Sequence, residues 1–165
     1  MVVDQVDEIL AQWARERPDL DASPMGVVGR ICRLSPLLVE AQSAVFRELG
    51  LDFASFDVLA TLRRSGSPYE LTPGELATSM MVTPGAVTQR LARLEEQSLI
   101  ARRHDDPDRR KVTVALTPRG RALIDRAVPA HLENEHHILA EFSSAELATF
   151  AGLLRRLLHA YEGRR

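Results

Sequence analysis

The sequence predicts a mainly α-helical fold that carries a small β-ribbon, and two observations support this. Ser/Thr-Pro pairs and capping boxes mark helix starts along the chain, because a side-chain hydroxyl caps free backbone N–H groups and proline fits the first helical turn. Between helical segments, LIARRH and KVTVAL have the character of strands and flank the polar stretch DDPDRR. The 165 residues, 45% of them hydrophobic, suffice for one ordinary domain with its own core.

Two helices are predicted in the first 50 residues. The first covers about residues 3–17, where apolar residues including Trp13 fall on one stripe. RPDLDASP interrupts that period, and a second helix runs over about 24–48 from the pair Ser-Pro to Gly50. Pro36 lies inside this helix and is a candidate for a kink.

Short elements follow one another closely in the middle of the chain. A helix over about 53–64 stops at SGSP, and two short helices at about 73–81 and 84–97 have almost nothing between them. The two strands come next. Two short helices joined by a tight turn and followed by a two-stranded ribbon are typical of a winged helix-turn-helix, so RRHDDPDRRKV at 102–112 becomes the tip of the wing.

The chain is predicted to finish with two more helices. Thr117-Pro118 starts one that runs to about Glu141. Ser143 and Glu146 form a capping box before the last helix, which covers 144–162.

The charge is distributed unevenly along the chain. The net charge is -2, yet residues 83–121 hold nine Arg or Lys against five Asp or Glu, a net +4 that leaves -6 for the rest. A basic segment on an acidic protein is the pattern expected when one face meets phosphates.

Several classes of protein find no support in the sequence. There is no secretory signal and no apolar window of membrane-spanning length, so we expect a soluble cytoplasmic protein without a membrane partner. Cys32 cannot form an internal disulfide, and its apolar helix predicts packing in the interior rather than a redox switch. HLENEHH at 131–137 lacks the His pair of a metal site, and no catalytic motif or phosphate loop is readable, so we expect no cofactor, no metal and no enzyme.

The helix predicted at 84–97 has a buried stripe and an outward face. Leu91 and Leu94 fall within about 40° of Val87 on a helical wheel. The opposite face carries Gly85, Gln89, Ala92 and Arg93, with Thr88 at its edge. Gln can read adenine, Arg can read guanine, and small residues allow close approach to a groove, which favours double-stranded DNA as the partner over a merely solvated face.

Arg90 and Asp57 occupy awkward positions. Arg90 lies about 65° from the centre of the apolar stripe, and Asp57 shares a helical face with Phe53, Phe56 and Ala60. A half-buried charge needs a partner. Two interpretations stay open: a structural Asp–Arg pair, or a polar pocket for an anionic ligand.

At this point three motifs resemble those of the MarR family (multiple antibiotic resistance regulators): LTPGELA at 71–77, TPGAVTQRLARLEEQSLIARR at 83–103 and DDPDRRKVTVALTPRG at 105–120. The resemblance implies a winged helix-turn-helix on a helical dimerisation platform, with Arg110 entering the minor groove and Asp108 orienting it. The DNA-binding residues expected in all are Thr72, Pro84, Gly85, Thr88, Gln89, Arg93, Asp108 and Arg110. Ser98 departs from the family's usual glycine and would cost about 1 kcal/mol if the position needs positive φ.

The segment WARERPDLDASPM precedes the long helix and resembles a narrower subgroup, the urate-responsive regulators with their PecS and TamR relatives. That resemblance implies ligand-binding roles for Trp13, Asp57, Arg90 and Arg102. We therefore expect a homodimeric transcriptional regulator, a repressor released from a palindromic operator by a small anionic effector such as urate. The rival interpretation is a helical adaptor or an enzyme that uses the same fold without DNA.

The expected organisation has three parts. These are N-terminal dimerisation and pocket helices at 1–49, a winged helix-turn-helix DNA-binding domain at 50–118, and C-terminal dimerisation helices at 119–165.

Overall fold

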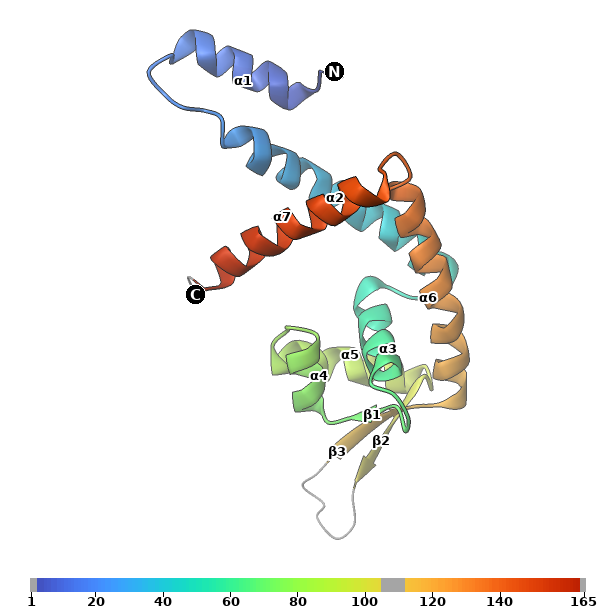
Figure 1. Ribbon diagram of the computed structural model, residues 1–165. Coiled ribbons are helices and arrows are strands. Elements are labelled where there is room, and N and C mark those ends of the chain that lie inside the picture. The colour runs from blue at the N-terminus through green and yellow to red at the C-terminus, as the bar shows by residue number, and fades with distance from the viewer. Residues whose placement is uncertain (1–2, 105–111, 164–165) are drawn as a thin grey trace.

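A computed structural model of the protein describes residues 3–104 and 112–163, and its elements follow the predicted order (Figure 1). The elements are α1 (Gln5–Glu16), α2 (Met25–Glu48), α3 (Phe53–Arg64), β1 (Glu70–Leu71), α4 (Pro73–Ser79), α5 (Pro84–Glu96), β2 (Ile100–His104), β3 (Val112–Leu116), α6 (Pro118–Ile138) and α7 (Ser144–Glu162). The prediction of a mainly α-helical fold with a small β-wing is confirmed.

Most of the predicted helix starts are correct. Thr83 and Thr117 accept hydrogen bonds from backbone N–H groups of α5 and α6, and capping boxes begin α4 and α7. The start of α2 is the exception, because its N-terminal cap is Pro24 and no side chain caps it. A capping box made by Asp4 and Asp7 at α1 was not predicted.

The β-sheet has one more strand than the predicted ribbon. Its order is β1-β3-β2 and both pairings are antiparallel, with Glu70 opposite Ala115. Strand β1 is two residues long and follows Tyr69, whose φ is 64°. A strand this short has no alternation of apolar and polar residues, so the sequence contained no signal for it.

The buried core lies within the module formed by α3, α4, α5 and the sheet, which the end of α2 and the start of α6 complete. The side chains that are at most 1% exposed include Phe46, Val58, Leu59, Leu62, Leu76, Val87, Leu91, Leu94, Val114 and Ile124. They come from every one of these elements except β1 and β2, so the module is held as one unit. We call residues 51–104 and 112–117 the winged-helix module.

Gly120 is the tightest contact between α6 and the winged-helix module. A Cβ atom built there would lie 1.9 Å from the carbonyl oxygen of Leu99, so no larger residue fits without a shift. Thr117 strengthens the same junction, because its N–H donates to Leu99 O at 3.1 Å. Ser98, just before, has φ 57°, as expected for a position where the family usually has glycine.

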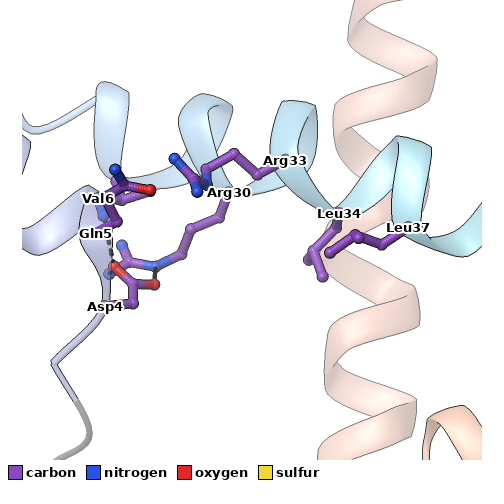
Figure 2. Close-up of a pocket in the computed structure, with 7 residues that line it drawn as sticks. All are labelled: Asp4, Gln5, Val6, Arg30, Arg33, Leu34 and Leu37. Atoms are coloured by element: carbon purple, nitrogen blue, oxygen red, sulfur yellow. Dashed lines mark hydrogen bonds and ion pairs between the residues drawn. The ribbon is translucent and has the colours of Figure 1, made fainter.

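The other helices lie apart from this core. In Figure 1, α1 runs beside the first half of α2, and α7 passes above the module. Arg30 of α2 fastens α1, because its guanidinium donates to Asp4 Oδ2 at 2.8 Å and to Asp7 Oδ1 at 2.7 Å. Figure 2 shows the pocket beside this clamp, which Leu34 and Leu37 of α2 continue.

Cys32 is exposed on α2, so the prediction that it packs in the interior is wrong for the single chain. It lies in an apolar groove between α1 and α2, where Val28 is 57% exposed. No described element covers this face of α2. Within residues 3–104 and 112–163, no helix is long and apolar enough to cross a membrane.

Candidate DNA-binding face and effector site

Helix α5 presents the face that the helical wheel predicted. Val87, Leu91 and Leu94 are at most 1% exposed and fix the helix against the core. The exposed residues of α5 include Pro84, Gly85, Thr88, Gln89, Ala92 and Arg93. At Gly85 an added Cβ would meet no heavy atom within 4 Å, so the start of α5 is open to a close neighbour.

Two threonines of the predicted DNA-binding set already use their hydroxyl groups. Thr72 donates to Glu75 Oε2 at 2.8 Å within the cap of α4, and Thr88 donates to Pro84 O at 3.1 Å. A phosphate only accepts hydrogen bonds, so either hydroxyl would have to leave its present partner to donate to one. Thr88 also carries a methyl group, which suits apolar contact with thymine.

A groove of about 580 Å³ separates the start of α3 from the outward face of α5. Gln89, Arg90 and Arg93 line it from α5, and Asp52 lines it from the N-terminus of α3. Arg93 Nη1 donates to Asp52 Oδ2. Sequence reasoning missed Asp52, although its place immediately before Phe53 marked it as a helix cap.

The described part of the wing is supported by ion pairs at its base. Arg103 Nη1 lies 3.5 Å from Glu70 Oε1, which ties β2 to β1. Arg102 Nε lies 3.1 Å from Glu95 Oε2 of α5, but the groups are not aligned as a hydrogen bond. Asp108 and Arg110, the predicted wing contacts, lie outside the described residues.

Asp57 and Arg90 face each other across the α3–α5 contact. Arg90 Nη1 lies 3.5 Å from Asp57 Oδ2, and the two side chains are 24% and 28% exposed. The separation exceeds that of a charge-assisted hydrogen bond, about 2.7–2.9 Å. Arg90 Nη1 is buried and has no hydrogen-bond partner among the described residues. The structure therefore has the predicted Asp–Arg pair in an open form.

Desolvation dominates the chemistry of Asp57. Burial raises the pKa of its carboxyl, and the charges of Arg90 and Arg64 only partly oppose that rise. The ionised carboxylate is therefore not fully compensated for its loss of contact with water. Asp57 and Arg90 therefore satisfy each other only in part.

The other two predicted ligand-binding residues lie elsewhere. Arg102 engages Glu95, five residues beyond Arg90 on α5 and so on a different face of that helix. Trp13 is 39% exposed on α1, which lies beside α2 and away from α3 and α5 (Figure 1). Of the four residues, Asp57 and Arg90 are the two whose side chains are in direct contact within a single chain.

The histidine-rich segment of α6 takes part in packing. The His131 ring lies 4.9 Å from that of Phe56 and 5.3 Å from that of Phe46, and its Nε2 is 3.2 Å from Glu135 Oε1. The residues that the structure describes contain no group of three side chains able to hold a metal ion.

A capped helix, a second helix with an open outward face and a β-wing define a helix-turn-helix transcriptional regulator of the winged class. Comparison with known families identifies which family of such regulators it is: residues 49–111 match the MarR family. A relative, the HTH-type transcriptional regulator PecS of Dickeya dadantii, is 42% identical over 153 residues, which are 93% of this chain and 92% of the relative. The chain therefore belongs to the MarR family, which is a family of transcriptional regulators and not of enzymes. PecS also belongs to the subgroup that the N-terminal segment predicted.

Solved structures agree with this fold. BpsR of Bordetella bronchiseptica, described in terms of regulation of its DNA binding by 6-hydroxynicotinic acid, is 29% identical with a TM-score of 0.70, covering 79% of this chain and 91% of its own. Sco3205 of Streptomyces coelicolor, a MarR family regulator solved in complex with DNA, has a TM-score of 0.77 at 19% identity, covering 86% and 93% of the two chains. At that identity Sco3205 supports the fold alone.

Proposed function

We propose that this regulator is a homodimeric repressor that binds a pseudo-palindromic operator and is released from it by a small anionic ligand. The observation that carries the proposal is the α3–α5 contact. There, one helix holds both an outward base-reading face and Arg90, a half-buried arginine with an unsatisfied donor.

The case for a homodimer rests on α7. None of its residues is buried, although a helix of a folded protein is stabilised mainly by packing its apolar face. Its exposed apolar side chains are Phe150, Leu153, Leu154, Leu157, Leu158 and Tyr161. Burying one such side chain contributes about 1.5–3 kcal/mol, so a second copy that covered this stripe would stabilise the pair substantially. The dimerisation helices would be those at 3–49 and 119–162.

The case for base reading rests on α5. Its apolar stripe is fully buried, so Gln89 and Arg93 project from a rigid element while the open start of the helix at Gly85 admits a close neighbour. Gln89 suits adenine and Arg93 suits guanine in a major groove. In a two-fold dimer the two α5 helices would enter successive major grooves, with half-sites about 10 bp apart. Arg110 of the wing would enter the minor groove, with Asp108 orienting it.

The case for an anionic effector rests on Asp57 and Arg90. An anionic aromatic such as urate would accept charge-assisted hydrogen bonds from Arg90 and would repel Asp57. Because Arg90 belongs to α5 and Arg102 to the strand that leads into the wing, engaging either one displaces a DNA-reading element. Ligand and DNA would then oppose each other with a coupling of roughly 1–3 kcal/mol. Trp13 would join such a site from the α1 helix of the second copy.

Trp13 also supplies the test, since it is the only tryptophan. Urate is titrated into the protein–DNA complex while indole fluorescence and DNA release are followed together, with wild type, Asp57→Asn and Trp13→Phe. Wild type should show quenching with release. Asp57→Asn should quench without release, because the repulsion between the ligand and Asp57 is lost. Trp13→Phe should lose the indole signal, which assigns the quenching to Trp13. If urate and related anions neither quench nor release, the effector proposal fails and Asp57 is a structural ion-pair partner.

A further inference from the structure

Asp52 makes two contacts that join α3 to the base-reading face of α5. Its Oδ1 accepts a hydrogen bond from Ser55 N at 2.7 Å, which caps α3, and its Oδ2 accepts one from Arg93 Nη1. The Asp52 side chain is 42% exposed and that of Arg93 is 58% exposed. The pair is thus at the surface, on the wall of the groove between the two helices.

The Asp52 carboxylate is held both in charge and in position. Burial by itself would raise its pKa, but hydrogen bonds from Ser55 and the charge of Arg93 outweigh that effect and lower the pKa. A carboxylate at a helix N-terminus is also favoured by the helix dipole. Helix α3 is anchored in the core by Val58, Leu59 and Leu62, which are all 0% exposed, so the carboxylate is attached to a rigid element.

Arg93 keeps donors available while it is held. Asp52 engages Nη1, and among the described residues Nε and Nη2 have no partner. A guanidinium presents its donors in a fixed planar fork, so fixing one nitrogen orients the others. A free arginine side chain on the surface would instead lose rotamer entropy on engaging a base.

We propose that Asp52 is a positioning residue that aims Arg93 at a base edge and so contributes to the sequence preference of the regulator. The inference rests on the proposed function, in which α5 reads DNA. Two other roles give different results: a carboxylate that only caps α3, and one that restrains Arg93 and must release it before DNA can bind.

The measurement is the ratio of two affinities. Duplexes selected by the wild-type protein from a randomised pool are compared with a scrambled duplex of the same length, at one salt concentration. The variant Asp52→Asn keeps a capping oxygen of similar strength and removes the charge. The matched control is Glu96→Gln, which removes a negative charge from the wall of the same groove. Losing a negative charge raises affinity for both duplexes, so the ratio isolates the effect on base reading.

For Asp52→Asn we expect the ratio to fall by about fivefold, which corresponds to about 1 kcal/mol, the upper end for an exposed ion pair. The preference that Asp52→Asn loses should be the preference for the same base pair that Arg93→Ala affects. In a protein that already carries Arg93→Ala, adding Asp52→Asn should cause no further loss of preference. Glu96→Gln should leave the ratio unchanged. Urea unfolding shows whether Asp52→Asn still folds. If it does not, the same measurement is made with Asp52→Ser, because serine is also a good helix cap.

Each other outcome overturns the inference. An unchanged ratio for Asp52→Asn makes Asp52 a helix cap alone. A ratio that rises makes it a restraint on Arg93. If the wild-type protein prefers no duplex in the pool, the proposed function itself fails. If the wild-type protein selects duplexes but the ratio for Asp52→Asn does not fall, only the inference about Asp52 fails.

Discussion

Replacing Gly120 by alanine tests the junction between α6 and the winged-helix module. The added Cβ would lie 1.9 Å from Leu99 O, more than 1 Å inside the closest approach that such atoms make, about 3.0 Å. The obstacle is a backbone oxygen that also accepts a hydrogen bond from Thr117 N–H, so it cannot turn aside as a flexible side chain would. Overpacking of this kind costs about 1–3 kcal/mol, and a backbone clash belongs at the upper end.

For a chain of this size, about 3 kcal/mol lowers Tm by roughly 6–12 °C. Thermal unfolding followed by circular dichroism, at equal protein concentrations, measures this shift. The control is Gly74→Ala in α4, where an added Cβ meets nothing within 4 Å and alanine favours the helix, so Tm should stay or rise slightly. If Gly120→Ala melts with the wild type, α6 does not meet the module at Leu99 in the way described.

Three further predictions concern the wing, the dimer and pH. Arg110→Ala should weaken binding to all DNA sequences and reduce the slope of log affinity against log salt by about one. Arg93→Ala should instead change the preferred bases. If affinity and slope are unchanged in Arg110→Ala, the wing is a solvated loop. Leu157→Glu should shift the protein toward monomer in analytical ultracentrifugation, because it places a charge on the apolar stripe of α7, and a dimer as stable as the wild type would exclude α7 from the interface. The fold raises the pKa of Asp57, so the protonated carboxyl stabilises the folded state below its ordinary pKa. That stabilisation is lost as the pH rises through the raised pKa, and in Asp57→Asn the free energy of unfolding should not show this loss. Asp52, with a lowered pKa, has the opposite sign: Asp52→Asn should remove a stabilisation that wild type loses as pH falls, and urea unfolding across acidic pH separates the two.

Helices were the most predictable part of this fold. Helices α3 and α7 have the bounds predicted from the sequence, because their caps and apolar stripes are local features. The same local logic placed Arg90 and Asp57 as partners, since each was a charge on an apolar stripe of its own helix. Ser98 has a φ of 57°, which meets the condition under which serine in place of glycine costs stability.

What the sequence did not reveal depends on contacts between distant segments. Strand β1 exists only through its pairing with β3, and two residues carry no period. Asp52 acts on Arg93 across 41 positions of the chain, so its cap signal gave no indication of its second partner. Cys32 was predicted to be buried because its helix is apolar, but the single chain does not cover that face.

The residues of the candidate ligand site also differ in how far the sequence could predict them. Asp57 and Arg90 are positioned by α3 and α5, which pack within one module, so helical periodicity sufficed to pair them. Trp13 and Arg102 entered by resemblance; Trp13 is exposed on α1, and the ion-pair partner of Arg102 is Glu95. In the proposed dimer, the position of Trp13 relative to that pair would depend on the arrangement of two copies, which periodicity within one sequence does not encode.

The central claim is that two copies of α5 read one operator as a two-fold dimer. The most direct measurement is hydroxyl-radical footprinting of the wild-type protein on genomic DNA fragments that it retains, with analytical ultracentrifugation of the same complex. One dimer should protect two symmetrical half-sites about 10 bp apart. Protection of a single unsymmetrical half-site, or a complex with one chain, would contradict it.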